Sequence, residues 1–127
     1  LTPDGGATAF LAEFVSRQVL TELCLTGAPI SGERMHALGA VNRLVESGHA
    51  LSMAVELAAE ISVGPQNAMS RIKHLCRHAM RNSLDEQLEL EAQSMVEAMG
   101  GDESKEGIDA FLNKRSPNYT PLRQVSE

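Results

Sequence analysis

The 127-residue sequence predicts a mainly α-helical chain with at most one or two short strands. Aromatic residues make up only 3% of it and Trp is absent, so Leu, Val, Ile, Met and Ala must build any core. That composition favours packed helices over a β-sandwich or a barrel. Apolar residues also recur every three or four positions along much of the chain, which is typical of amphipathic helices.

Glycine and proline divide the first fifty residues into short elements. The expected elements are a turn at 1–6, helices at 7–16, 19–25 and 31–38, and a weak strand at 41–46. Ser31 is expected to cap the third helix and Gly39 to end it. The strand prediction rests on alternation alone, because both faces of that segment carry apolar residues.

The second part of the chain predicts longer helices. They are expected at 50–63, 65–81, 84–99 and 102–114. Ser83 and Glu86 match a capping box at the start of the third of these, and Asp102 is expected to cap the last. The tail contains Pro117 and Pro121, and we expect it to wrap over a surface of the protein or over a neighbouring subunit.

Charge and composition argue against several classes of partner. The net charge of −6 leaves no overall basic field, so we expect no nucleic acid partner. No apolar run is long enough to span a membrane, and a cytoplasmic protein with reduced, buried thiols at Cys24 and Cys76 is expected. His74 and His78 lie four residues apart, but no nearby acid or Cys completes a metal site.

The charges are unevenly distributed along the chain. Residues 71–81 carry four basic side chains and no acid, whereas residues 85–109 carry nine acids against one Lys. One interpretation is that two solvated helix faces attract each other. The other is that the basic strip lies near a polyphosphate ligand.

Four segments, in this order and at these separations, resemble the crotonase family, the enoyl-CoA hydratases and isomerases. They are LTPDGGAT at 1–8, LTGAPISGERMHALGAVNRLV at 25–45, GPQNAMSRIKHL at 64–75 and EGIDAFLNKRSPNY at 106–119. The chain departs from the family pattern at Glu13, Ser16, Met35 and Ala40, where the family often has Arg, Gly, Ala and Leu. Those departures lie at helix-packing positions and bear on the shape of the substrate pocket.

The resemblance implies the C-terminal part of an α/β fold, a spiral of ββα units followed by helices used for trimerisation. Residues 1–46 would end the spiral core with the active-site turn, and residues 47–127 would form the helical trimerisation region. The partners implied are an acyl-CoA substrate and further copies of the chain, as a trimer or a dimer of trimers. No separate cofactor is implied, because coenzyme A is part of the thioester. The rest of the spiral, with the oxyanion-hole donors and the hydratase carboxylates, would lie upstream.

Asp4 is the candidate catalytic residue. In the resembling family its position holds a small residue in many hydratases and a catalytic Asp in some isomerases. A carboxylate there can move a proton while preorganised donors hold the enolate oxyanion. The alternative is that Asp4 caps the following helix or forms an Asx-turn with Gly5 and Gly6. Gly5 and Thr8 of the same segment are expected to lie against the substrate.

Phe111 and Lys114 form a second candidate site. Three residues apart on a helix, they would share a face. They match a Phe and a Lys that approach the adenine and the phosphates of CoA in the resembling family. The alternative is that Phe111 belongs to the core and Lys114 is a cation at a helix C-terminus.

Together these observations predict an acyl-CoA enzyme of fatty-acid metabolism that isomerises or hydrates an enoyl-CoA thioester. Asp4 favours the isomerase over the hydratase, which is a lyase. The isolated chain is expected to be inactive. A different class of function is also open, a non-catalytic oligomerisation module derived from such an enzyme.

Overall fold

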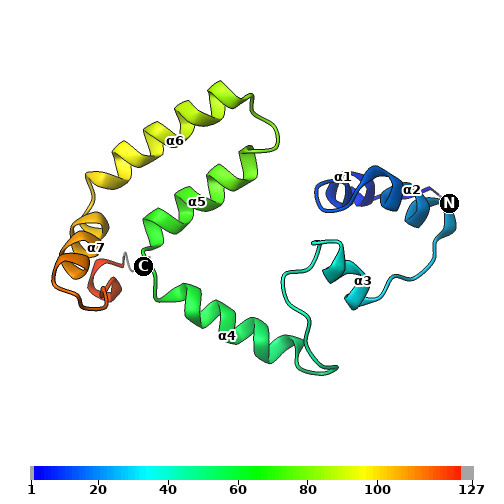
Figure 1. Ribbon diagram of the computed structural model, residues 1–127, viewed down its shortest axis with the longest axis horizontal. Coiled ribbons are helices and arrows are strands. Elements are labelled where there is room, and N and C mark those ends of the chain that lie inside the picture. Colours follow the sequence, from blue (N-terminus) through cyan, green and yellow to red (C-terminus); the bar gives the residue numbers. More distant parts are fainter. Residues whose placement is uncertain (1, 124–127) are drawn as a thin grey trace. The chain divides into compact units, whose positions relative to one another are not determined.

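The computed structural model describes residues 2–123 and confirms a mainly helical chain. The described residues form seven α-helices and one short 3-10 helix, without a strand (Figure 1). They divide into two compact units, one up to residue 53 and one from residue 54 onward. The expected division by role, at residue 46, is of another kind and remains a prediction.

Three short helices form the first unit. They are α1 (Ala7–Ala12), α2 (Arg17–Thr26) and α3 (Gly32–Ala37). The predicted helix over 7–16 is wrong at its end, because α1 stops at Ala12 and Ser16 is instead the N-cap of α2. The hydroxyl of Ser16 accepts a hydrogen bond from the backbone N–H of Val19 at 3.4 Å. Serine favours such a cap over a helix interior, and α1 and α2 pack on each other across this break.

The segment after α3 corrects the one strand prediction. Residues 41–46 are irregular, and no described segment offers them a strand partner. A real edge strand would show one apolar and one polar face, and this segment lacked that contrast from the start. The end of α3 follows its prediction closely, since Gly39 adopts a left-handed φ of 78° immediately after the helix.

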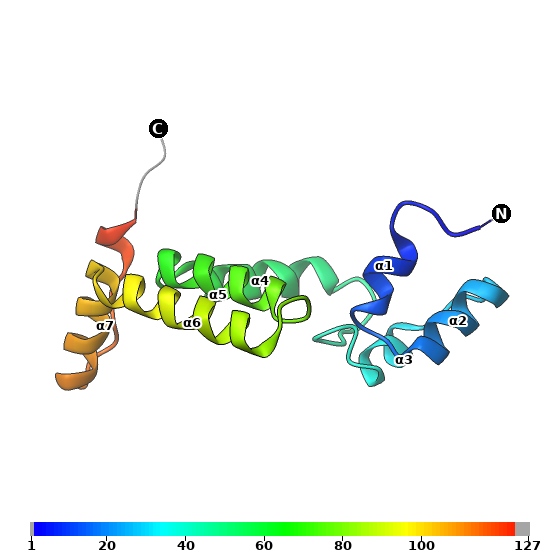
Figure 2. The same cartoon turned by 90° about the horizontal axis from the view of Figure 1, so that it is seen from above.

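Longer helices form the second unit. They are α4 (Ala50–Ser62), which begins before the unit boundary, α5 (Gln66–His78), α6 (Leu84–Met99) and α7 (Asp102–Leu112), followed by η1 (Thr120–Leu122). Helices α5 and α6 lie side by side and α7 contacts α6 (Figures 1 and 2). The helix predicted to reach residue 81 ends at His78. The predicted Asp102 cap is also wrong, because Gly101 is the N-cap and Asp102 is the first helical residue.

A capping box begins α6, and a buried glutamine joins α6 to α5. The predicted capping box is confirmed, with Glu86 N–H donating to Ser83 Oγ at 3.3 Å and Ser83 N–H donating to Glu86 Oε2 at 2.8 Å. Gln87 is the one buried polar side chain of the described residues. Its amide donates to the carbonyl of Leu75 at 3.3 Å and accepts from the side chain of Asn82 at 3.1 Å, so it joins the two helices.

The tail folds back over its own unit. The backbone N–H of Asn118 donates to a carboxylate oxygen of Glu106 on α7 at 2.6 Å. Farther along, the guanidinium of Arg123 donates to the carbonyl of Ser62 at the end of α4. The tail therefore lies over a surface of this chain, and its contact with a neighbouring subunit remains a prediction.

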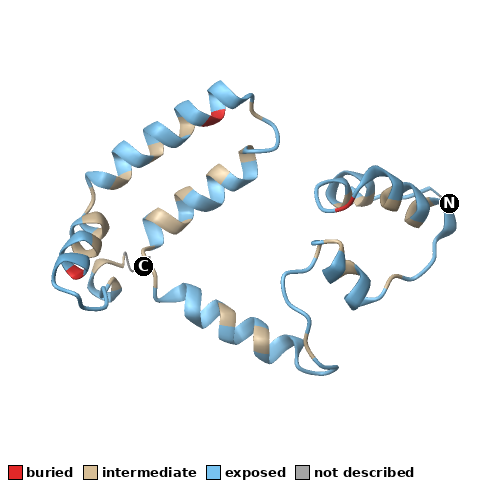
Figure 3. Cartoon of the chain, in the orientation of Figure 1, coloured by how far each residue is buried: buried red, intermediate tan, exposed pale blue. Residues whose placement is uncertain are grey.

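Few side chains are buried. Val15 and Ala110 are the buried apolar residues of the described chain, and most of the rest is exposed (Figure 3). Large apolar residues on α6, such as Leu84, Leu88 and Met95, remain exposed. The expectation of two buried thiols fails for the same reason: both cysteines are free, Cys24 is half-buried and Cys76 is exposed. None of the described helices has the length and apolar character needed to cross a bilayer.

Candidate functional site

The turn that precedes α1 is built around two glycines. Gly5 and Gly6 have left-handed φ values of 59° and 85°, and the N–H of Ala7 closes the turn on the carbonyl of Asp4 at 3.0 Å. A Cβ at Gly6 would stand 2.7 Å from a ring carbon of Phe10, so no other residue fits there without movement of the ring. The sequence thus fixes where Asp4 stands relative to α1.

The carboxylate of Asp4 has no structural duty as a helix cap. The N-cap of α1 is Gly6, and no side chain caps this helix. Asp4 is exposed, as are Gly5 and Thr8. Asp4 therefore does not cap α1, and its backbone carbonyl closes the turn of Gly5 and Gly6. The catalytic role of Asp4 and the substrate contacts of Gly5 and Thr8 remain predictions.

The second candidate site lies at the end of α7. Phe111 is 82% exposed, so it lies outside the core that the described residues form. Helix α7 ends at Leu112, so Phe111 and Lys114 do not share a helix face as predicted. Lys114 lies beyond the helix with φ 52°, and it is the one described residue other than glycine with a positive φ. Both side chains are exposed near the same helix end.

A specific hydrogen-bonded turn creates this geometry. The N–H of Lys114 donates to the carbonyl of Phe111 at 3.2 Å, and the N–H of Arg115 donates to the carbonyl of Ala110 at 3.0 Å. These two bonds define the Schellman motif, which usually carries glycine at its left-handed position. A side chain there costs about 1–2 kcal/mol, because its Cβ crowds the following carbonyl.

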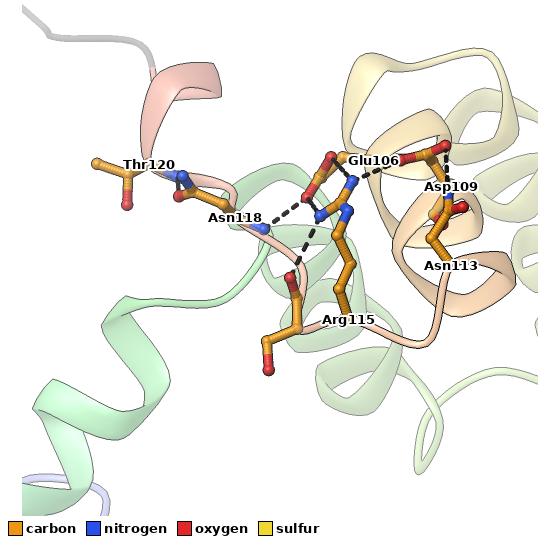
Figure 4. A network of polar contacts seen from close by, with 7 residues as sticks. Glu106, Asp109, Asn113, Arg115, Asn118 and Thr120 are labelled. Carbon is orange, nitrogen blue, oxygen red and sulfur yellow. Dashed lines mark hydrogen bonds and ion pairs between the residues drawn. The ribbon is translucent and has the colours of Figure 1, made fainter.

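Arg115 ties the chain beyond this turn to α7 (Figure 4). Its guanidinium forms a two-bond ion pair with Glu106, with N–O distances of 2.6 and 2.9 Å, and a further pair with Asp109 at 2.5 Å. The same guanidinium donates to the carbonyl of Ser116 at 3.2 Å. Planar guanidinium and carboxylate groups match each other in such pairs, which are stronger than neutral hydrogen bonds.

The electrostatics of this cluster follow from its hydrogen bonds. The bonds from Arg115, and then the backbone bond from Asn118, lower the pKa of Glu106 from its ordinary 4.5 to about 2. The bonds with Glu106 and Asp109 raise the pKa of Arg115. Glu106 and Arg115 are therefore both charged at neutral pH.

An open hollow of about 400 Å³ lies among α5, α6 and α7. Its lining includes Ala68, Met95, Ile108 and Tyr119. Glu103 of α7 stands at this hollow and caps α5 from outside. Its carboxylate accepts from the backbone N–H groups of Asn67 at 2.9 Å and Ala68 at 3.0 Å, and from the side chain of Asn67 at 3.2 Å. Pro65, the N-cap of α5, offers no side-chain acceptor, so Glu103 supplies it.

The basic segment pairs in part with the acidic one. Arg71 of α5 forms an ion pair with Glu97 of α6, as the interpretation of attracting helix faces predicts. His74 and His78 place their rings 4.3 Å apart. Across residues 2–123, no group of three or more His, Cys, Asp or Glu side chains is arranged to hold a metal ion.

Sequence reasoning missed the roles of Glu103, Glu106 and Arg115. Glu106 and Arg115 both lie in the segment EGIDAFLNKRSPNY, but their pairing depends on the left-handed turn at Lys114. A lysine does not predict a left-handed conformation, so the turn could not be expected from the residue type. Glu103 is separated from Asn67 by 36 positions, so only the packing of α7 near α5 reveals it.

Comparison with known proteins gives consistent results. A family model described as enoyl-CoA hydratase/isomerase matches residues 1–121. The chain is 33% identical to the 1,2-epoxyphenylacetyl-CoA isomerase of Escherichia coli, covering 94% of this chain and 46% of that protein. It is 30% identical to the enoyl-CoA hydratase EchA19 of Mycobacterium tuberculosis, covering 94% and 45%. The crystal structure of an enoyl-CoA hydratase from Polaromonas sp. JS666 matches with a TM-score of 0.88 at 39% identity, covering 93% and 46%. The chain thus spans less than half the length of each of these relatives.

Proposed function

Because this chain belongs to the enoyl-CoA hydratase/isomerase family, we propose that it supplies the C-terminal half of an enzyme acting on an enoyl-CoA thioester. The Escherichia coli and Mycobacterium tuberculosis relatives named above carry a CoA thioester in their names, one as an isomerase and one as a hydratase. Family membership therefore supports the substrate class, and the reaction must be argued from residues.

Asp4 carries the proposed chemistry, which is double-bond isomerisation. In this proposal its carboxylate takes a proton from C2 of a 3-enoyl-CoA and returns it to C4. The electron pair of the broken C2–H bond becomes the new C2=C3 double bond, and the π pair of the old C3=C4 double bond forms the new C4–H bond. Between the two proton transfers, the thioester oxygen holds the negative charge of the dienolate. Preorganised N–H donors would stabilise that charge. Those donors, and the carboxylates that a hydratase needs, belong in this proposal to the upstream half of the enzyme.

The observation that supports this role is the state of Asp4 in its turn. The carboxylate is exposed, caps no helix, and stands beside a glycine pair that allows close approach of a ligand to the backbone. Gly5 and Thr8 are the proposed neighbours of the acyl group. Phe111 and Lys114 are the proposed contacts for the adenine and the phosphates of CoA, and both side chains are exposed as that role requires.

The test uses the full-length protein that carries this sequence, with and without Asp4→Asn. Isomerisation of a 3-enoyl-CoA and hydration of a 2-enoyl-CoA are followed in parallel. Loss of a positioned base lowers the rate by about a hundredfold or more, so isomerisation should fall by at least that factor. Asp85→Asn, which removes an exposed carboxylate from α6, is the matched control and should change neither rate. Unchanged isomerisation in Asp4→Asn would refute the role.

A second candidate function, an assembly module without its own catalysis, is favoured by the exposed apolar residues. Large apolar side chains such as Leu84, Leu88 and Val96 on α6 are more than half exposed. In soluble proteins such faces are usually covered by another surface. We therefore expect self-association, as a trimer or a dimer of trimers.

Sedimentation and binding measurements separate the two candidates. An enzyme binds an acyl-CoA in its complete form, whereas a pure module only associates with itself. A monomer in sedimentation equilibrium at micromolar concentration would contradict the self-association that both candidate functions assume. Acyl-CoA binding that is lost in Lys114→Gln would support the enzyme over the module.

A further inference from the structure

A lysine occupies the left-handed position at the end of α7, where a side chain destabilises the turn. At the other left-handed positions of the described residues the chain has glycine. Helix α3 ends in the same turn, with Gly39 N–H bonded to the His36 carbonyl at 2.9 Å and Ala40 N–H bonded to the Met35 carbonyl at 3.0 Å. Glycine takes the left-handed position there without steric cost. Lys114 takes it in α7. Sparsely populated backbone conformations persist where the surroundings enforce them, and they gather at ligand sites.

Arg115 holds Lys114 in its left-handed conformation through both its backbone and its side chain. Its N–H closes the turn on Ala110, while its guanidinium reaches back to Glu106 and Asp109 on α7. Glu106 then accepts the N–H of Asn118, so the chain is also held after the turn (Figure 4). Lys114 is thus fixed between two attachments to one helix, and its conformation does not depend on its own preference.

Of the two neighbouring cations, Lys114 and Arg115, only Arg115 forms ion pairs with the described carboxylates. Two carboxylates and the Ser116 carbonyl occupy the guanidinium of Arg115, which leaves it little capacity for an external anion. Lys114 is exposed, and none of the described carboxylates forms an ion pair with it. Among the described residues the Lys114 ammonium has no carboxylate partner, whereas Arg115 anchors the turn to α7.

We propose that Arg115 is a positioning residue, whose ion pairs with Glu106 and Asp109 lock the turn that presents the Lys114 ammonium to the phosphates of an acyl-CoA. The inference rests on the proposed function, in which Lys114 binds the nucleotide end of the substrate. Arg115 itself touches no substrate. Its removal acts on substrate binding through Lys114 and leaves the chemical step at the acyl end alone.

The experiment measures kcat and KM of the full-length protein with an enoyl-CoA and with the N-acetylcysteamine thioester of the same acid, which lacks the nucleotide. The variants are Arg115→Gln, Lys114→Gln and the double variant. Loss of a charge-assisted contact corresponds to about a tenfold change in affinity, so each single variant should raise KM for the CoA thioester by about that factor. The values of kcat, and both constants for the truncated thioester, should not change.

Non-additivity identifies the positioning role. The double variant should have the KM of Lys114→Gln alone, because Arg115 then has nothing left to position. Arg115→Lys should restore part of the affinity. Arg34→Gln, which changes a cation near the glycine-ended turn of α3, is the matched control and should leave KM unchanged.

Each other outcome overturns the inference in a distinguishable way. A raised KM in Lys114→Gln with a normal KM in Arg115→Gln refutes the positioning role and leaves the proposed function standing. A normal KM in both refutes the nucleotide site itself. Additive effects would mean that Arg115 binds the phosphates directly. Should Arg115→Gln fail to fold, Glu106→Gln removes the charge but keeps an acceptor for Asn118, and a normal KM in that variant refutes the inference equally.

Discussion

Helices α3 and α7 close with the same pair of backbone hydrogen bonds, but they hold the turn in different ways. At α3 the left-handed residue is Gly39, and no side chain is needed to keep it in place. At α7 it is Lys114, and the guanidinium of Arg115 binds two carboxylates of the helix around it. The same backbone motif can therefore be stable by residue type or by tertiary contacts. In the second case the position is free to carry a functional side chain.

The starts of the helices repeat this difference. Ser16 and Ser31 each cap the helix that follows them directly, as Val19 and Arg34 donate to their hydroxyls. In the second unit the N-cap of α5 is a proline, and the helix takes its acceptor from Glu103 on α7. The first unit thus closes its helix ends with neighbours in sequence, whereas the second also uses distant side chains. The stability of helix ends in the second unit should therefore change when residues distant in sequence are substituted.

The largest expected effect comes from the most distant contact. Glu103→Ala removes the acceptor of two backbone N–H groups at the start of α5, and loss of a helix cap costs up to about 2 kcal/mol. We expect a fall of about 2 kcal/mol in the free energy of unfolding by urea. Glu103→Gln keeps one oxygen and should lose less. Glu56→Ala on α4 is the control, and an equal loss there would contradict the cap.

Gly39→Ala tests the turn that depends on residue type. The left-handed conformation costs an alanine about 1 kcal/mol, although the space beside Gly39 is open, so stability should fall by about that amount. Gly32→Ala is the matched control in the same helix, because Gly32 has ordinary helical φ and its added methyl would only touch Leu44. If both variants were equally stable, backbone conformation would not be the reason for glycine at 39.

Lys114→Gly makes the opposite change at the second turn. Glycine relieves the left-handed strain but adds freedom to the unfolded chain, so we expect a gain of only about 0.5 kcal/mol in thermal or urea unfolding. The same variant should lose affinity for an acyl-CoA if Lys114 binds its phosphates. A stability gain combined with an affinity loss would show that the side chain is kept for binding. A loss of stability would contradict the strain argument.

Predictions from sequence succeeded in both units where a local signal fixes a helix end. The helical class, the capping box at Ser83 and the glycine end at Gly39 depend on residues within a few positions, and they were predicted correctly. The helix end at Ala12 was missed because the apolar face continues past it to Val15. The strand at 41–46 was wrong because alternation without a polar face does not identify a sheet edge.

The candidate sites show the same limit. Asp4, Gly5 and Thr8 could be placed together from sequence because one glycine turn holds them. The geometry at the end of α7 could not be predicted from sequence. The positive φ of Lys114 depends on the ion pair between Arg115 and Glu106, which the sequence does not show. The exposure of Phe111 was equally hidden, since its spacing on α7 is that of an ordinary core residue.

The smallest expected effect is a pH dependence confined to the turn of α7. The pKa of Glu106 is lowered to about 2, so the stability that its carboxylate contributes is fully present above about pH 4.5 and is lost as the pH falls toward 2. The amide resonance of Asn118, whose N–H donates to Glu106, should shift with a midpoint near pH 2. Glu106→Gln should abolish that shift. The amide of Gly39 binds only a backbone carbonyl and should not follow the same titration. If the amide resonance of Asn118 instead shifted with a midpoint near pH 4.5, Arg115 would not bind the Glu106 carboxylate in solution. The left-handed conformation of Lys114 would then need another cause.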